Sequence, residues 1–572
     1  MGTRLDTEAA EAKTEMGNPK ETRAGLRGRR HFLGQLASGG AVAALTAPVV
    51  ADARAPQRGA SFDVRAFGAA GDGQRLDTTS LQAAVEACAG TGGGTVRFPA
   101  GNYLSGTLFL KSNVTLWLEA GAVVLGSANL KDYPPRTPAF RSYTDVNYVE
   151  HSLLYAERVE HVSIVGPGVI DGQGQAKAWQ LGHGRASYKR RPFLIRMIEC
   201  RQVTLRDVTL RNAPMWVQHY LACDDLLLDG LTVDSVVNAN NDGVDVDCCR
   251  RVRIANCRIR SGDDAIVLKS TAPRACEQVV VMNCELSSDC NAFKCGTEST
   301  GGFRDIAVSN CIIHDTRLSG IALEMVDGGS LEGVTIANLR IVRTRNPIFL
   351  RLGNRARPYL ASGPGGGSGT HAIEPGMAIP SVGHFRNVQL AHISGEGGDI
   401  VGCALAGLRG HPLEDIRLAG LRLAFGGGGR TADVSRPIPE REEVYPEYSM
   451  FGRLPAYGLF CRHVRGLVLD GVELASVSPD QRPALVGDDV EKVELSGWRA
   501  TGSPDAPEIL LRNVRDLWIH SSRPAPMSAV LVRVEGDASR EIVIAATPRH
   551  KGQPLLDRAA EVPAEAVRLI DP

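Results

Sequence analysis

The chain is 572 residues long and carries 64 Lys and Arg residues against 64 Asp and Glu residues, so its formal net charge at pH 7 is zero. This balance argues against a nucleic-acid-binding protein, which would carry a basic excess or a basic stripe. Hydrophobic residues at 43% and charged residues at 22% are ordinary for a folded soluble protein and exclude global disorder.

The first 58 residues are predicted to be an export signal with a disordered N-terminus. Residues 28–34 read Gly-Arg-Arg-His-Phe-Leu-Gly, an uncharged stretch runs from 35 to 50, and small residues at 51–55 offer cleavage sites. This order is typical of a secretory signal, and the paired arginines are similar to the twin-arginine type. The alternative, a membrane anchor, needs about 20 apolar residues, and this run is shorter. We therefore expect a periplasmic or secreted protein.

A helix is predicted at the start of the folded part. Residues 77–89 place Leu81, Val85 and Cys88 on one helical face, and Asp77 precedes them as a suitable N-cap. A helix at this position would cover the first strands that follow and protect their open edge.

Short apolar segments then recur along the chain. Each segment alternates apolar with other residues and ends in a polar turn residue, and the turn residues are Asp207, Asp229, Asn256, Asn283, Asn310 and Asn338. Weaker copies begin at Val388, Ile416, Leu467, Val493 and Leu517. Strand repeats with a period of about 20–30 residues are typical of a solenoid in which each repeat covers its neighbour.

The repeats indicate an all-β fold. A leucine-rich-repeat solenoid would need its own leucine frame and a helical segment in every repeat, and the sequence has neither. Because parallel crossovers are right-handed, we predict a right-handed parallel β-helix over residues 60–540, with a short N-terminal capping helix and a C-terminal tail at 541–572. Two insertions, at 356–380 and 426–459, are too long to be turns and are expected to be functional or disordered.

Three cysteines occupy the same place in successive repeats, directly after the turn asparagine: Cys257, Cys284 and Cys311. We interpret them as a column of small buried thiols, with disulfides as the alternative. The chain's cysteines show no paired CxxC spacing, so no structural zinc site is predicted, and no other metal or cofactor is expected.

Carboxylates gather on two adjacent repeats. Residues 240–247 read Asn-Asn-Asp-Gly-Val-Asp-Val-Asp, and residues 262–269 read Gly-Asp-Asp-Ala-Ile-Val-Leu-Lys. Aligning the inward apolar residues places Asp242 one coil, about 4.8 Å, from Asp264, and a bend near Gly262 would turn Asp263 the same way. Three carboxylates this close are costly and are not needed for stability. They favour general acid and base catalysis around a water molecule.

These motifs resemble those of glycoside hydrolase family 28, the polygalacturonase and rhamnogalacturonase group. The resemblance extends from Phe62 to Leu474 and includes Asn-Ala-Pro-Met-Trp at 212–216 as well as the two carboxylate motifs. It implies a metal-independent inverting hydrolase that cuts α-linked pectic saccharides containing galacturonate or rhamnose. It also implies that Asp264 is the general acid and that Asp242 and Asp263 activate the water.

The chain departs from the family at two motifs. Residues 289–298 read Asp-Cys-Asn-Ala-Phe-Lys-Cys-Gly-Thr-Glu, and either Cys290 or Asn291 stands where the family has the histidine of Gly-His-Gly. Rhamnogalacturonase-like members also lack this histidine, so its loss does not imply inactivity. Residues 322–324, Ala-Leu-Glu, stand where the family has Arg-Ile-Lys, which binds a galacturonate carboxylate.

The register also predicts which side chains bind the substrate. Asp247, Lys269, Gly296, Glu324 and Arg351 form one outward column, and Asp245, Val267, Lys294, Ala322 and Phe349 form the next. Lys269 and Arg351 are expected to pair with Glu324 or to meet a substrate acid. Asn291 and Lys294 are placed beside the carboxylates. The alternative for Lys269, Glu324 and Arg351 is a surface ion-pair ladder of little energetic value.

Aromatic residues supply further candidates for substrate binding. Trp216 and His219, one coil before Asp242, either form a wall that stacks on sugars or pack under a loop. In the second insertion, Tyr445, Tyr448, Phe451 and Tyr457 are likewise expected either to stack on sugar rings or to pack the loop onto the solenoid.

The sequence thus predicts an exported glycosidase whose partner is a pectic polysaccharide or oligosaccharide, with no nucleic-acid partner and no stable membrane span. One alternative is a β-helix polysaccharide lyase, which would use a basic residue and calcium held by Asp242, Asp245 and Asp247. The other is a non-catalytic carbohydrate-binding solenoid, which the two altered motifs would favour. The sequence does not assign the oligomeric state.

Overall fold

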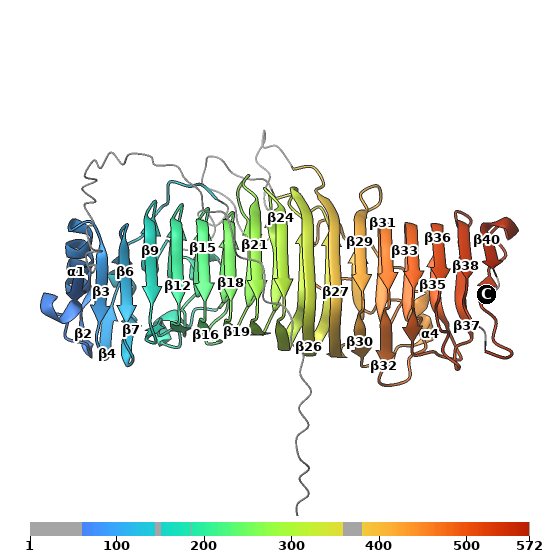
Figure 1. The fold of residues 1–572 in the computed structure, drawn as a ribbon, viewed down its shortest axis with the longest axis horizontal. Helices are drawn as coiled ribbons and strands as arrows, with labels where there is room; N and C mark the ends of the chain where they lie inside the picture. Colours follow the sequence, from blue (N-terminus) through green and yellow to red (C-terminus); the bar gives the residue numbers. More distant parts are fainter. Residues whose placement is uncertain (1–59, 143–149, 183–184, 358–379, 549, 571–572) are drawn as a thin grey trace, which may run out of the picture. The chain divides into compact units, whose positions relative to one another are not determined.

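The predicted repeats are consecutive coils of a parallel β-helix in the computed structural model (Figure 1). The structure describes residues 60–142, 150–182, 185–357, 380–548 and 550–570. The predicted signal at 1–58 therefore lies outside the described residues, as does most of the insertion at 356–380. Each coil pairs in parallel with the coil before it and the coil after it, which builds three columns of strands. Parallel crossovers of this kind give the right-handed coil that was predicted.

Every strand belongs to one or more of the three columns. The first column contains β5 (Leu108–Phe109), β8 (Ser152–Glu157), β11 (Phe193–Ile198), β14 (Gln218–Leu221), β17 (Val244–Asp247), β20 (Ile266–Ser270), β23 (Phe293–Ser299), β25 (Ile312–Met325), β26 (Ser330–Leu352), β28 (Cys403–Ala406), β31 (Leu459–Asp470), β33 (Leu485–Ser496), β35 (Pro507–Arg512), β37 (Val530–Glu535) and β39 (Leu556–Arg558). The second contains β1 (Ser61–Asp63), β3 (Gly94–Phe98), β6 (Val114–Leu118), β9 (Glu160–Val165), β12 (Arg201–Arg206), β15 (Asp224–Asp229), β18 (Arg250–Ala255), β21 (Cys276–Met282), β24 (Phe303–Ser309), parts of β26, β31 and β33, β27 (His384–Gly398), β29 (Leu413–Ala419), β36 (Arg515–His520), β38 (Arg540–Ala545) and β40 (Val567–Ile570). The third contains β2 (Asp72–Leu76), β4 (Gly101–Ser105), β7 (Ala122–Gly126), β10 (Val169–Asp171), β13 (Thr209–Arg211), β16 (Thr232–Ser235), β19 (Arg258–Ser261), β22 (Glu285–Ser288), parts of β25, β26 and β27, β30 (Arg422–Phe425), β32 (Glu473–Ser476) and β34 (Arg499–Ala500).

The apolar residues aligned from the sequence are direct neighbours in the second column. Val203 pairs with Leu226, and the pairing continues through the equivalent residues of the next coils: Val252, Val279, Ile306, Val334, Val388, Ile416, Leu467, Val493 and Leu517. All of them are buried in the core that fills the coils. The predicted register is therefore confirmed, because one face of each strand must be covered by the same face of the next coil.

The recurring polar turn residues are explained by the backbone. Asn256, Asn283 and Asn310 have φ between 55° and 56°, a left-handed conformation that asparagine tolerates better than most residues. Their side chains also connect the coils, since Asn283 Nδ2 donates to Asn256 Oδ1 at 3.3 Å. At the Asp229 turn the left-handed position moves to Gly230, with φ 65°.

The column of cysteines is made of buried free thiols, as predicted. Cys257, Cys284 and Cys311 are 2–3% exposed, and the backbone N–H of Cys284 points to the sulfur of Cys311 at 3.4 Å. All thirteen cysteines lie in the described residues, and each is free.

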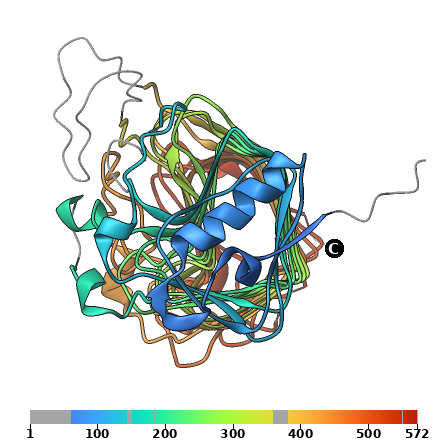
Figure 2. The same ribbon diagram turned by 90° about the vertical axis from the view of Figure 1, so that its left-hand side faces the viewer.

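The helix at the N-terminal end of the coils differs from the sequence-based expectation in its cap. Helix α1 (Thr78–Gly90) buries Leu81, Val85 and Cys88 and packs against β1 and β3 across the first coils (Figure 2). Asp77 does not cap this helix with its side chain; its carboxylate accepts hydrogen bonds from the N–H groups of Ala70 and Gly71 at 2.8 and 2.9 Å.

At the C-terminal end, parallel strand pairing continues through β38, β39 and β40, so the coils extend beyond residue 540, where the sequence analysis placed a tail.

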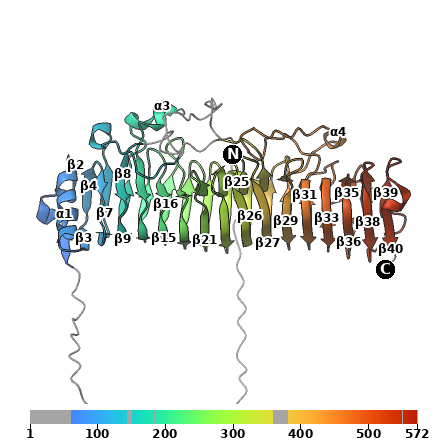
Figure 3. The ribbon, with the colours of Figure 1, turned by 90° about the horizontal axis from the view of Figure 1, so that it is seen from above.

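The remaining helices are short and lie in the connections. They are η1 (Val64–Phe67), η2 (Leu130–Asp132), η3 (Lys177–Trp179), α3 (Arg185–Tyr188), α4 (Thr431–Val434) and η4 (Ala564–Ala566), where η denotes a 3₁₀ helix. The connections that carry α3 and α4 project from the same side of the coils (Figure 3). Within the described residues, no helix is both long and apolar enough to cross a membrane.

Candidate active site

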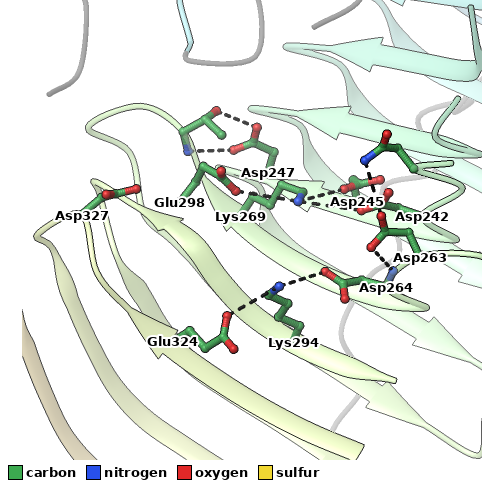
Figure 4. Close-up of polar contacts among 12 residues, drawn as sticks. Asp242, Asp245, Asp247, Asp263, Asp264, Lys269, Lys294, Glu298, Glu324 and Asp327 are labelled. Carbon is green, nitrogen blue, oxygen red and sulfur yellow. Dashed lines mark hydrogen bonds and ion pairs between the residues drawn. The ribbon is translucent and has the colours of Figure 1, made fainter. Parts of the chain in front are cut away.

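The three predicted catalytic carboxylates meet at the start of β17 and β20. Val244 pairs with Ile266, which places Asp242 beside Asp264 on the neighbouring coil. The chain bends at Gly262 and Asp263, and each of the three carboxylates has an oxygen within 4.8 Å of the other two (Figure 4). Asp242 and Asp264 are 3% and 4% exposed, and Asp263 is half-buried. The predicted cluster is therefore present in the structure, with Asp263 as its most accessible member.

A buried asparagine fixes the turn that carries Asp242. Asn241 accepts hydrogen bonds from the N–H groups of Val237 and Asn238 and donates to the carbonyls of Ala213 and Met215. Its amide thus uses both its acceptor and its donors, so the turn is held to two other segments of the chain. The position of Asp242 is set by this framework.

Lysine side chains lie on both sides of the carboxylates. Lys294 Nζ is 3.2 Å from Asp264 Oδ2 and 3.5 Å from Glu324 Oε2. Lys269 Nζ is 3.4 Å from Asp245 Oδ1, with Glu298 at 3.8 Å and Asp242 at 3.9 Å. Both ammonium groups are buried, so these are ion pairs shielded from solvent (Figure 4).

Two arginines close the other end of this arrangement. Arg355 and Arg357 both contact Asp327, and Arg357 Nη2 donates to Glu298 Oε1 at 2.6 Å. Together with the residues above and Glu447, these side chains make up what we call the acid–base network: Asp242, Asp245, Asp263, Asp264, Glu298, Glu324, Asp327 and Glu447 with Lys269, Lys294, Arg355 and Arg357. Carboxyl groups outnumber cations in it by eight to four.

The excess of carboxyl groups shifts the pKa values of the network. Burial raises the pKa of Asp242 well above its usual range, and Asp263 and Asp245 raise it further. Burial and the Asp264 carboxylate also raise the pKa of Asp263. Burial raises the pKa of Glu324 to about 8, although Lys294 opposes this shift. At neutral pH the network therefore retains protons on some of its carboxyl groups.

The two lysines respond in the opposite sense. Burial alone would lower the pKa of Lys294, but the carboxylates of Asp264 and Glu324 raise it well above its usual range. In the same way, Asp245 and Glu298 outweigh burial and raise the pKa of Lys269. Both lysines are therefore held as ammonium ions, which stabilise negative charge on the neighbouring carboxylates.

Of the two residues that the sequence offers in place of the family's histidine, Asn291, and not Cys290, hydrogen-bonds to Asp264. Asn291 donates to Asp264 Oδ1 through its side chain at 2.8 Å and through its backbone N–H at 3.1 Å. Its own carbonyl oxygen accepts from the backbone of Ser319, which fixes the amide orientation. Asp264 is thus held by Asn291 on one oxygen and by Lys294 on the other.

Three predicted substrate-binding residues have structural roles instead. Arg351 is 1% exposed and donates to the carbonyls of Gly407 and Glu440, so it neither pairs with Glu324 nor reaches a substrate. His219 is fully buried and contacts Asp247 at 3.3 Å. Trp216 is 3% exposed and stacks on Phe193 with ring centroids 5.2 Å apart, so it packs inside the molecule.

The insertion at 426–459 reaches the network through one of its four aromatic residues. Tyr448, Phe451 and Tyr457 are 1–4% exposed and pack the loop onto the coils. Tyr445 is 49% exposed, and its hydroxyl accepts a hydrogen bond from Lys294 Nζ at 3.3 Å. The two expectations for this loop therefore apply to different residues, and Tyr445 alone of the four is accessible.

The calcium set considered for a lyase is not assembled. Asp247 binds Thr271 and His219 instead of turning towards Asp242. Among the described residues, the group with oxygens close enough to hold a metal ion is Asp242, Asp263 and Asp264.

Two surface cavities lie away from the acid–base network and contain none of its residues. One is lined by Arg158, Glu199 and Arg274 among others, and the other by His161, Thr204 and Arg253 among others.

Comparison with known proteins relates part of this chain to a family. Residues 88–352 match the family model of glycosyl hydrolases family 28. This stretch of the chain is similar to that family. It contains the three clustered aspartates, both lysines and Glu324, whereas Arg355, Arg357 and the whole loop with Tyr445 lie beyond it. The resemblance drawn from the sequence is thereby confirmed.

Proteins that are similar to this chain in sequence have names that refer to polygalacturonate cleavage. The chain is 34% identical to a probable polygalacturonase of Vitis vinifera over 36% of its own length and 43% of that protein. It is 28% identical to an exo-poly-alpha-D-galacturonosidase of Dickeya chrysanthemi, over 36% of its own length and 41% of that protein. The chain thus spans about two fifths of these relatives.

A solved structure agrees with the fold. The hyperthermoactive exopolygalacturonase from Thermotoga maritima superposes with a TM-score of 0.54 and 22% identity, covering 64% of this chain and 87% of that one.

Sequence analysis missed several members of the network. Glu298 closes the segment 289–298, but its side chain was not assigned a role. Arg355 and Arg357 stand at the edge of the first insertion, where the repeat no longer gives a register. Glu447 lies two residues after Tyr445 in the second insertion, which is not a strand, so no register indicates it.

Proposed function

We propose that this protein is a glycoside hydrolase that cleaves α-linked pectic-type saccharides by general acid and base catalysis. The observation that carries the proposal is the meeting of Asp242, Asp263 and Asp264 within 4.8 Å, in a stretch that matches a family of glycosyl hydrolases. Neutral pH leaves protons in this cluster, so it contains both a proton donor and proton acceptors. Acid and base catalysis at one glycosidic bond needs both.

In the proposed mechanism Asp264 protonates the leaving oxygen. Asn291 and Lys294 fix its carboxyl group, and the proton that it delivers comes from Asp242 or Asp263, the carboxyl groups whose pKa values are raised. Asp242 and Asp263 activate the attacking water: one of them accepts its proton, and Lys269 stabilises the Asp242 carboxylate before that transfer. Fixed, buried groups of this kind stabilise the charge that develops in the transition state more strongly than the same groups would in water.

We propose that the anomeric configuration is inverted. Inverting pairs usually stand about 6.5–9.5 Å apart to admit a water between them, whereas the nearest oxygens here lie within 4.8 Å. We therefore place the water against the two carboxylates of Asp242 and Asp263, and not in the gap between a single acid and a single base. Proton NMR of the first product tests this: the anomer opposite to that of the substrate is expected, and a retained anomer would contradict it.

A lyase fits the site less well. Proton abstraction would need a neutral base, and the two candidate amines, Lys269 and Lys294, are held as ammonium ions by their carboxylates.

The pectic substrate class is supported by the relatives, which are named for polygalacturonate.

The decisive experiment compares the full chain with Asp264→Asn and with a control, Asp516→Asn, at an exposed position of β36. Each protein is incubated with polygalacturonate and with rhamnogalacturonan, and new reducing ends and ultraviolet absorbance are followed. Reducing ends without absorbance, lowered about 10²–10⁴-fold in Asp264→Asn alone, are expected. Unchanged turnover in Asp264→Asn would refute the assignment, and binding without any cleavage would indicate a carbohydrate-binding solenoid.

We also propose that the protein is exported through the twin-arginine-type signal within residues 1–58. The support is the order of Arg29-Arg30, an uncharged stretch and small residues in the sequence. Replacing both arginines by lysine should leave the protein in the cytoplasmic fraction of its host. An unchanged periplasmic or extracellular fraction would contradict this route.

A further inference from the structure

Among the described residues, the side chains next to Asp264 leave no cation for a substrate carboxylate. Lys294 has three N–H donors, and three acceptors surround its Nζ: Asp264 at 3.2 Å, Tyr445 at 3.3 Å and Glu324 at 3.5 Å. Lys294 is 2% exposed and Glu324 is fully buried, so a substrate group cannot displace Glu324 from the solvent side. Three acceptors of the protein therefore surround the ammonium, two of them carboxyl groups.

The other cations of the acid–base network are occupied as well. Lys269 is shared by three carboxylates and lies over the ring of Trp216, at 4.8 Å from its centroid. Arg355 and Arg357 are both engaged by Asp327 and Glu298. Since each cation of the network already faces at least two of its carboxyl groups, a further carboxylate would add charge that nothing compensates. Uncompensated charge away from water is strongly unfavourable.

The accessible part of the network suits hydroxyl groups. Tyr445 is 49% exposed and offers a ring on which the C–H face of a sugar can stack. Glu447 is half-buried: its Oε2 is buried without a hydrogen-bond partner, and the rest of its side chain is partly exposed. Asp263, also half-buried, completes this accessible edge. A sugar hydroxyl can donate to a carboxylate oxygen, whereas a second carboxylate cannot.

We infer that the sugar unit bound at Tyr445 and Glu447, beside Asp264, is uncharged, so that this subsite selects a neutral sugar over galacturonate. The inference rests on the proposed function, because it names the substrate unit of that same site. Glu324 and Lys294 beneath the subsite set its charge, and Tyr445 and Glu447 contact the sugar.

The test uses four disaccharides that differ only at C6: α-1,4-linked digalacturonate, its two singly carboxyl-reduced forms and the doubly reduced form. For the full chain, kcat/KM should be highest for a disaccharide with a neutral unit at one particular position, by about tenfold over digalacturonate. Glu447→Gln should narrow this preference at that position, because it removes one acid from the accessible edge. Glu443→Gln, an exposed change in the same loop, is the matched control and should leave the preference unchanged.

A preference for digalacturonate would overturn the inference, and so would an equal effect of the two glutamine variants. Failure of the proposed function is distinguishable, because in that case the chain cleaves none of the four disaccharides. Calorimetric binding of the same four then decides the inference independently. Tighter binding of a form with a neutral unit supports it, and tighter binding of digalacturonate refutes it.

Discussion

Replacing Glu324 by glutamine should change how the stability of the protein depends on pH. Glu324 is fully buried, and its pKa is raised from 4.5 to about 8 in the folded chain. Between these two values the folded state binds a proton that the unfolded state has released. The contribution of Glu324 to the free energy of unfolding should therefore fall as the pH rises from about 4.5 to 8.

The size of the effect follows from the same two values. The difference of about 3.5 between them, at about 1.4 kcal/mol for each unit of pKa, gives a loss of at most about 5 kcal/mol at pH 9 relative to pH 4. Glutamine keeps the shape of the protonated side chain and cannot ionise. Glu324→Gln should therefore match the wild type at pH 4 and be more stable by several kcal/mol at pH 9.

Urea unfolding followed by tryptophan fluorescence, at a series of pH values from 4 to 9, measures this difference. Titrating groups that do not interact with Glu324 contribute equally to both proteins and cancel in the comparison. Glu565→Gln, an exposed change in η4, is the control and should follow the wild type throughout. A difference between Glu324→Gln and the wild type that does not vary with pH would refute the reasoning, because it would mean that Glu324 keeps the same charge in both states.

Three further variants test other parts of the structure. Lys269→Met should lower the free energy of unfolding by about 3–5 kcal/mol, because it leaves buried carboxylates uncompensated, and adding Asp245→Asn should restore part of the loss in the same urea assay; no recovery would contradict the pairing. Asn291→Ala should lower kcat about tenfold with little change in KM, since Asp264 loses a donor that fixes it, and unchanged initial rates would show that Asn291 is dispensable. Asn283→Ala should cost about 1–2 kcal/mol at its left-handed turn and Asn283→Gly less; equal losses would argue against backbone conformation as the cause.

The register of the coils could be predicted from sequence because it follows from one physical requirement. Every second residue of a strand must enter the core, and the same residue of the next coil must cover it. That rule places Val244 opposite Ile266, and the position of Asp242 beside Asp264 follows directly. It also gives the outward column in which Lys294 stands beside Ala322.

The contacts of the outward side chains could not be predicted in the same way. Alternation separates the inside of a coil from its outside, but it does not say what covers the outside. Arg351 points outward from its strand as expected, yet the second insertion covers it and accepts its hydrogen bonds. His219 also points outward and is fully buried by other side chains.

The choice of partner for Glu324 depended on side-chain length and direction as well as on register. The register offers Lys269 and Arg351 as partners of Glu324, but in the structure Lys294 of the adjacent column contacts Glu324. Tyr445 reaches the same ammonium from a loop 151 residues away in the chain, a distance over which no repeat gives a register.

Cleavage in water enriched in oxygen-18 tests the central claim, hydrolysis at the carboxylate cluster, most directly. The full chain is incubated with a pectic oligosaccharide that it cleaves, and the products are analysed by mass spectrometry with Asp264→Asn as the comparison. Hydrolysis predicts one heavy oxygen at the new reducing end of one product, and far less of that product from Asp264→Asn. Products without heavy oxygen and with an unsaturated end would contradict the account, because they would show that the bond is broken by elimination.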